Sequence, residues 1–89
     1  HRVDPAGLEP MDHAIVLAVL DRFGGGPVGI ESLAALLSEE RETIEAVYEP
    51  FLVQSGYLER TPRGRMATQL CWDYFGRERP TGTRQGRLL

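Results

Sequence analysis

The stretch Phe51-Leu-Val-Gln-Ser-Gly-Tyr-Leu-Glu-Arg-Thr-Pro-Arg-Gly-Arg-Met-Ala-Thr68 decides the fold of this chain. A helix is predicted to end at Gly56 and a strand to begin at Tyr57. Pro62-Arg63-Gly64-Arg65 has the composition of a tight turn, so a second short strand is expected to return over residues 66–68. A helix followed by a two-stranded arm with arginines at its tip predicts a winged helix-turn-helix domain, in which the arm is the wing.

Helical periodicity predicts three helices ahead of the wing. The first begins near Glu9-Pro10 and ends at the glycine run 24–26, after which Pro27 prevents its continuation. Ser38 is expected to cap the third helix, and Pro50 to kink it. The inward faces are expected to be Met11, Ile15, Val16, Val19, Leu20 and Phe23 in the first helix, Ile30, Leu33, Ala34 and Leu37 in the second, and Ile44, Val47, Tyr48, Phe51 and Leu52 in the third.

The segments on either side of these helices complete the predicted fold, which is mainly α with a small antiparallel β wing. Val28-Gly29 is predicted to form a short strand that could pair with the wing. A phosphate-binding loop is the alternative for residues 24–29, but the spacing and the Lys-Ser/Thr pair of a P-loop are absent. Thr68 is expected to cap a last helix over residues 69–75, with Leu70, Cys71, Tyr74 and Phe75 inward. Trp72 is either core or partner-facing, and partial burial is expected.

The length of 89 residues allows one small domain. Residues 1–7 are interpreted as a linker severed from upstream domains, residues 8–76 as the winged-helix domain, and residues 77–89 as a disordered, Arg-rich tail. The sequence contains no apolar run long enough to span a membrane and does not open with a signal-peptide pattern, so a cytoplasmic protein is expected.

The net charge of −3 conceals an asymmetry along the chain. Residues 1–59 hold 11 of the 13 acidic residues and three arginines, whereas residues 60–89 hold seven arginines and two acidic residues. Any nucleic-acid contact must therefore come from the wing and the tail. The third helix, which would enter the major groove in a helix-turn-helix protein, exposes four carboxylates in its first half and is predicted to be a poor reader of bases. They belong to Glu39, Glu40, Glu42 and Glu45.

Residues able to perform a reaction are scarce. His1 and His13 are the only histidines and Cys71 is the only thiol, so a tetrahedral zinc site cannot be assembled. No serine or cysteine is expected to have a histidine within hydrogen-bond reach. The sequence therefore predicts neither a catalytic nor a metal-binding residue.

Three blocks are specific in combination: Gly-Gly-Pro-Val-Gly at 25–29, Glu-Pro-Phe-Leu-x-Gln-x-Gly at 49–56 and Arg-Thr-Pro-Arg-Gly-Arg-x-Ala-Thr at 60–68. With them the chain resembles, over roughly residues 4–76, the C-terminal domain of the RuvB family, bacterial ATP-driven motors that migrate Holliday junctions. The departures are small. Ser38 stands where a glycine is common in the family, and the tail is longer and rich in arginine.

The resemblance implies a winged-helix head that lies on double-stranded DNA at Holliday junctions, within a hexameric AAA+ ring that works with RuvA in DNA recombination and repair. It implies that the P-loop, the acidic metal-binding motif and the arginine finger lie upstream. ATP and magnesium then belong to the parent protein, and no cofactor and no ATP hydrolysis are expected of this fragment. The family's DNA contact corresponds here to Arg60, Arg63 and Arg65, and Gly64 is expected to supply the positive φ of the turn.

Three hypotheses about function remain open. The first is a DNA-contacting head of a translocase that does not recognise sequence. The second is the winged-helix domain of a sequence-specific transcription regulator, against which the carboxylates of the third helix count. The third is a protein-interaction winged helix that uses its acidic face and an apolar patch around Trp72. Titration with unrelated duplexes of equal length distinguishes the three.

Overall fold

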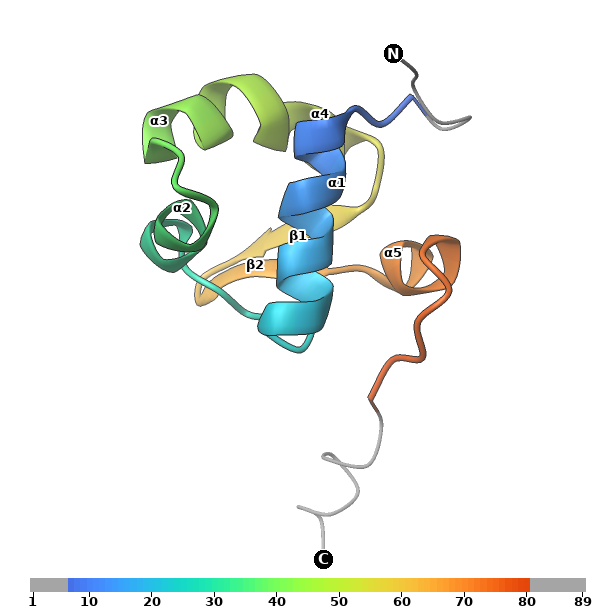
Figure 1. The fold of residues 1–89 in the computed structure, drawn as a ribbon. Coiled ribbons are helices and arrows are strands. Elements are labelled where there is room, and N and C mark those ends of the chain that lie inside the picture. The colour runs from blue at the N-terminus through green and yellow to red at the C-terminus, as the bar shows by residue number, and fades with distance from the viewer. Residues whose placement is uncertain (1–6, 81–89) are drawn as a thin grey trace, which may run out of the picture.

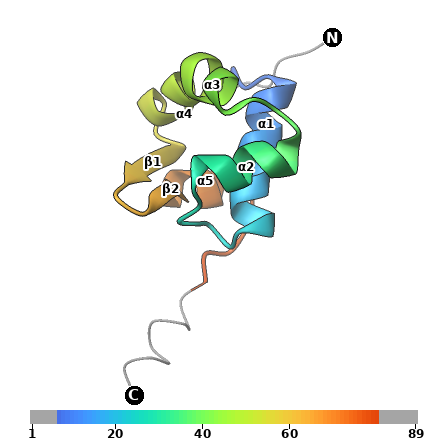
Figure 2. The same cartoon turned by 90° about the vertical axis from the view of Figure 1, so that its left-hand side faces the viewer.

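A computed structural model describes residues 7–80 and confirms the predicted winged-helix architecture. In Figure 1, α2 and α3 lie to the left of α1 and α5 lies to its right. Figure 2 shows the two-stranded antiparallel sheet at the left edge of the domain, below α4. The elements in chain order are α1 (Pro10–Leu17), η1 (Ala18–Arg22), α2 (Ile30–Leu37), α3 (Arg41–Thr43), η2 (Ile44–Tyr48), α4 (Glu49–Gln54), β1 (Leu58–Thr61), β2 (Gly64–Ala67) and α5 (Gln69–Tyr74). The segments η1 and η2 are π-helical.

The first helix begins as predicted and supplies the largest share of the core. Pro10 occupies its first position, and the side chain of Asp12 accepts a hydrogen bond of 2.9 Å from the backbone N–H of Glu9. The core brings together apolar side chains from every part of the domain. These are Leu8, Ile15, Val16, Ala18, Val19, Leu20, Val28, Ile30, Leu33, Ala34, Ile44, Leu52, Tyr57, Leu58, Ala67, Cys71 and Trp72.

The predicted third helix is divided into α3, η2 and α4, with Pro50 in the first turn of α4. A kink is expected at Pro50, and the structure has a π-helical segment, η2, directly ahead of the helix that contains this proline. A π turn holds one residue more than an α turn, which rotates the following residues by about 100° relative to a regular α-helix. The prediction that Val47 and Phe51 are buried is therefore wrong. Val47 is 60% exposed and Phe51 37% exposed, while Glu49 is turned inward.

The prediction that Ser38 caps the third helix is also wrong. Ser38 adopts the left-handed conformation, with φ 55°, and ends α2, whereas Glu40 precedes α3. The N–H groups of Ser38 and Glu39 donate to the carbonyls of Ala35 and Ala34, which is the Schellman arrangement of a helix C-terminus. The chain needs a left-handed residue here, and that requirement takes precedence over a capping role for the hydroxyl.

The last helix starts as predicted, with Thr68 accepting a hydrogen bond from the N–H of Cys71. Trp72 is only 5% exposed, so the expected partial burial is wrong. Its indole lies against Gly25, where a Cβ would come within 2.5 Å of Cζ2, and the missing side chain makes room for the ring. Leu70 and Tyr74 are exposed rather than inward because the helix packs through the neighbouring face that carries Cys71 and Trp72.

The expected linker and the expected tail lie partly outside the described residues. Residues 1–6 of the linker and residues 81–89 of the tail are not described. Arg77 is not part of a free tail, because its guanidinium donates two hydrogen bonds of 2.8 Å to the carboxylate of Asp21. This bidentate contact lowers the pKa of Asp21. None of the helices found between residues 7 and 80 is long and apolar enough to cross a membrane.

Candidate nucleic-acid interface

The wing is a hairpin with a two-residue turn. Strands β1 and β2 pair so that Thr61 lies opposite Gly64, which leaves Pro62 and Arg63 as the turn. The hydroxyl of Thr61 donates to the Gly64 carbonyl at 2.8 Å and accepts from the Arg63 N–H at 3.1 Å. The predicted hairpin is therefore confirmed. Its strands differ from the predicted ones at their ends, since β1 starts at Leu58 and β2 covers Gly64–Ala67.

A third segment joins the base of the wing. Val28 and Arg65 exchange two backbone hydrogen bonds, of 3.0 and 2.8 Å, so the predicted pairing of this segment with the wing is confirmed. Gly64 has φ +134°, and a Cβ at this position would lie 2.5 Å from the carbonyl oxygen of Val28. The glycine is thus required by the backbone of Val28 as well as by the positive φ expected from the turn.

Arg63 and Arg60 are the exposed cations of the wing. Arg63 lies in the turn, and its guanidinium has no hydrogen-bond or ion-pair partner within residues 7–80. The side chain of Arg60 is 60% exposed, and its Nη1 lies 3.9 Å from Oε1 of Glu49. Both side chains are therefore placed where an external anion can reach them.

Arg65, the third arginine that the resemblance assigns to the DNA contact, has a different environment from the other two. Arg65 is 8% exposed, and its Nε and Nη2 donate to the two carboxylate oxygens of Glu49. Its Nη2 also donates to Oε2 of Glu45 at 3.2 Å. The hydrogen bonds that Arg65 donates to Glu49 are the largest cause of a raised pKa for Arg65, and the charges of Glu49 and Glu45 act in the same direction, so Arg65 remains a cation.

Glu49 is the site residue that sequence reasoning missed. It is 3% exposed, because the π turn of η2 rotates it toward the wing. A signal was present in the spacing, since Glu45 and Glu49 are four residues apart and share one helical face. Two carboxylates on one face can share a cation, and Arg65 donates hydrogen bonds to both.

The third helix keeps an acidic surface beside the wing. Glu40 and Glu42 are exposed as predicted, while Glu39 and Glu45 are partly buried. Arg41 does not point outward as a free cation, because it pairs with Glu31 and lies 3.7 Å from Glu45. The exposed face of α3 and η2 therefore presents negative charge to any polyanion that approaches it.

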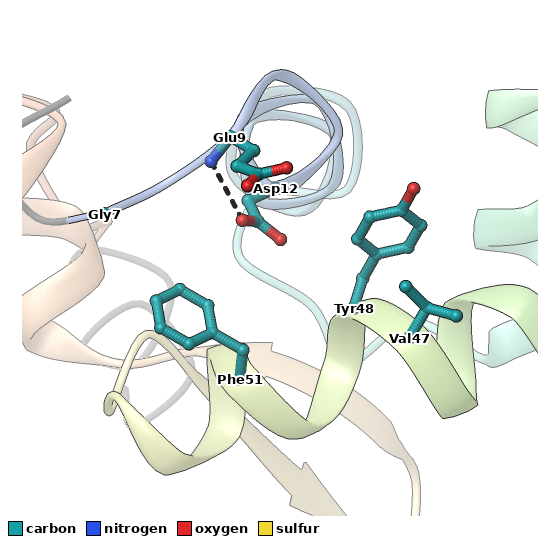
Figure 3. A pocket seen from close by; sticks show the side chains of 6 residues that line it. All are labelled: Gly7, Glu9, Asp12, Val47, Tyr48 and Phe51. Carbon is teal, nitrogen blue, oxygen red and sulfur yellow. Dashed lines mark hydrogen bonds between the residues drawn. The ribbon is translucent and has the colours of Figure 1, made fainter. Parts of the chain in front are cut away.

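Two hollows flank this helix, and both are lined by carboxylates. One of about 440 Å³ lies between α4 and β1. It is lined by Glu45, Glu49, Pro50, Val53, Gln54 and Arg60. The other, of about 380 Å³, lies between the start of α1 and the η2–α4 helix, where Figure 3 shows Asp12 and Glu9 facing Tyr48 and Phe51 across the hollow. The carboxylates that line both hollows disfavour a phosphate inside them.

Metal chemistry has no support in the described part of the chain. Between residues 7 and 80 there is no group of three His, Cys, Asp or Glu side chains that could hold a metal ion. Cys71 is buried, and this burial raises the pKa of its thiol to about 11. The thiol is thus protonated at neutral pH and is not a reactive nucleophile.

Comparison with known proteins gives a consistent result. The sequence model of a family described as "RuvB C-terminal winged helix domain" matches residues 5–76. The chain is 58% identical over 87 residues to the Holliday junction branch migration complex subunit RuvB of Myxococcus xanthus and to that of an Anaeromyxobacter species. In each case the match covers 98% of this chain and 25% of the relative.

A solved structure shows the same fold. The Thermotoga maritima RuvB Holliday junction branch migration motor superposes with a TM-score of 0.85 at 42% sequence identity. The match covers 88% of this chain and 26% of that chain. The chain thus spans about a quarter of the length of the relatives it matches.

Proposed function

The chain belongs to the RuvB C-terminal winged helix domain family, and from that premise we propose that it binds double-stranded DNA through phosphate contacts of its wing, as the DNA-contacting head of a Holliday junction branch migration motor. The observation that carries this proposal is the contrast between the wing and the third helix. Arg60 and Arg63 are exposed cations on the wing, whereas the helix beside them is lined by carboxylates.

The geometry favours contact with the DNA backbone over recognition of bases. Arg63 sits in a two-residue turn held by both side-chain hydrogen bonds of Thr61, so its backbone is fixed before DNA arrives. Phosphate contacts position a protein on a duplex but carry no sequence information. Insertion of α3 and η2 into the major groove would bring exposed Glu40 and Glu42 toward phosphates, which opposes base recognition. A motor that slides along DNA requires this indifference to sequence.

The rest of the motor is proposed to lie outside this chain. The 89 residues contain no lysine and no P-loop motif, so they do not fit a nucleotide site. The described residues likewise do not fit a magnesium site. ATP hydrolysis, magnesium binding, assembly into a RuvB hexamer and contact with RuvA are accordingly assigned to the remainder of the parent protein, in the bacterial cytoplasm. The contribution of this domain is to hold the duplex.

The two alternative hypotheses are weakened by particular residues. A sequence-specific regulator needs a helix that can approach base edges, and the exposed carboxylates of Glu40 and Glu42 at the start of the third helix oppose that approach. Trp72 is buried and cannot itself form a protein-interaction surface, although Leu70 and Tyr74 of the same helix are exposed. The exposed side chains of Val47 and Phe51 keep a protein contact elsewhere on the surface open.

Titration of the purified chain with fluorescent duplexes tests the proposal. Three duplexes of equal length and unrelated sequence should bind equally, no more tightly than about 10⁻⁴ M at physiological salt and more tightly at low salt. The double variant Arg60→Ala/Arg63→Ala should lose most of this binding. Arg22→Ala removes an exposed charge from η1 and is the control that should change little. A preferred sequence would support a regulator, and no binding at low salt would refute the proposal.

A further inference from the structure

The two strands of the wing place two cations side by side. Arg60 and Arg65 are direct cross-strand partners, so their side chains leave the same face of the hairpin. Like charges in this position repel each other and destabilise the pairing of the strands. A hairpin with this sequence therefore needs an anion on that face.

Glu49 supplies this anion from the adjacent helix. Its Oε1 accepts a hydrogen bond of 3.2 Å from Nη2 of Arg65 and lies 3.9 Å from Nη1 of Arg60. Its Oε2 accepts from Nε of Arg65. One buried carboxylate thus contacts both members of the cross-strand pair and connects the first turn of α4 to both strands of the wing.

The two arginines differ in how much freedom this contact leaves them. Arg65 is buried, and both oxygens of Glu49 engage it, so Arg65 cannot also reach DNA. Arg60 meets Glu49 at the longer distance, and most of its side chain stays exposed. The contact can therefore orient the guanidinium of Arg60 while leaving its outer N–H groups available.

We propose that Glu49 is a positioning residue for DNA binding: its buried carboxylate cancels the repulsion between Arg60 and Arg65, fixes the wing against α4 and holds Arg60 toward the duplex. This inference rests on the proposed function of the wing. The proposal gives an acidic residue a favourable role in DNA binding. Coulomb repulsion between its carboxylate and phosphate would, by itself, weaken binding.

The sign of one substitution separates positioning from simple repulsion. Glu49→Gln removes a negative charge close to the proposed phosphate site, so repulsion alone predicts tighter binding. Loss of positioning predicts weaker binding, by about 3- to 10-fold, the range of a single charge-assisted contact. Glu42→Gln is the matched control, because Glu42 is an exposed carboxylate of α3 with the same charge and without a contact to the wing. It should bind as the wild type does, or slightly more tightly.

Removal of the counterion of a buried arginine can unfold a small domain, so a second variant keeps the charge. Arg65→Lys retains the cation but loses the planar guanidinium that donates to both oxygens of Glu49 and to Glu45 in a fixed geometry. It should weaken duplex binding about 3-fold without any change in net charge. Arg79→Lys, at an exposed arginine hydrogen-bonded to Gln69, is its control and should not change binding.

All variants of this chain are titrated with one 20-base-pair duplex at low salt, at a temperature where thermal unfolding shows each to be folded. A merely structural role would lower the melting temperature and leave this affinity unchanged. Binding by the wild type that is weakened in Arg63→Ala supports the proposed function. If, in addition, the folded Glu49→Gln and Arg65→Lys variants bind as their controls do, positioning by Glu49 is refuted while the proposed function stands. If Glu49→Gln does not fold, Arg65→Lys alone decides. If the wild type does not bind, the proposed function itself fails.

Discussion

Gly64 and Val28 approach so closely that a Cβ on residue 64 would lie 2.5 Å from the carbonyl oxygen of Val28. The approach follows from the bridge between Val28 and Arg65, which ties the wing to the segment ahead of α2. The one side chain that this contact tolerates is a hydrogen atom. The position of the wing is thus decided by backbone packing at its base as well as by the turn at its tip.

Gly64→Ala should destabilise the domain by roughly 2–4 kcal/mol, because the methyl group collides with backbone and the positive φ disfavours a side chain. Urea unfolding monitored by circular dichroism measures this loss. Gly29→Ala is the control, since Gly29 has open space around its Cα and no positive φ. Equal stability of the two variants would show that the Val28 carbonyl does not restrict residue 64.

Ser38→Gly should stabilise the domain by about 1 kcal/mol, because Ser38 holds a left-handed conformation that costs a side-chain-bearing residue energy. The melting temperature should rise by about 4–8 °C for a domain of this size. Ser32→Gly, at an exposed position inside α2, should instead lower stability by roughly 0.5–1 kcal/mol. A destabilised Ser38→Gly variant would indicate that the hydroxyl makes a compensating contact.

The order of the elements could be predicted because apolar spacing, the glycine stops and the turn composition all indicate the same fold. The orientation of particular side chains in the third helix could not. An α-helical period places Val47 and Phe51 inward, but η2 adds a residue to the turn and brings Glu49 inward instead. A π segment depends on tertiary packing and on Pro50, and hydrophobic periodicity carries no sign of it.

In the candidate site, too, some residues could be predicted from the local sequence and others could not. Arg63 and Gly64 lie where the turn composition predicts, because short turns depend on local sequence. The orientation of the Arg65 side chain could not be predicted from the turn, since it is decided by the carboxylate of Glu49, 16 residues away in the chain. Trp72 is buried because distant Gly25 makes room for it. Contacts of this kind become visible only when the segments are placed in space.

The buried thiol of Cys71 predicts a loss of stability in alkali. Burial raises its pKa from 9.0 to about 11, so the unfolded chain loses this proton first as the pH rises. The stability contributed by the protonated thiol is complete below pH 9 and should fall by roughly 2–3 kcal/mol as the pH passes 11. Urea unfolding at pH 8, 9.5 and 11 measures the decline. In Cys71→Ala the decline should be smaller by that amount, and parallel curves would contradict this origin.

The number of phosphates that the wing contacts follows from the burial of its arginines. Arg60 and Arg63 are exposed and Arg65 is buried, so two phosphate contacts are expected. Each neutralised phosphate contributes roughly −0.9 to the slope of log affinity against log salt concentration, so the wild-type slope should be about −1.8.

The salt dependence of duplex binding by the wild type and by Arg63→Ala shows whether the wing tip contacts DNA phosphates. The variant should show a slope of about −0.9 and should weaken binding to all sequences alike, because one phosphate contact is lost and no base contact exists. Arg22→Ala should leave the slope at about −1.8. An unchanged slope in Arg63→Ala, with the variant folded, would remove the wing tip from the DNA interface and contradict the account.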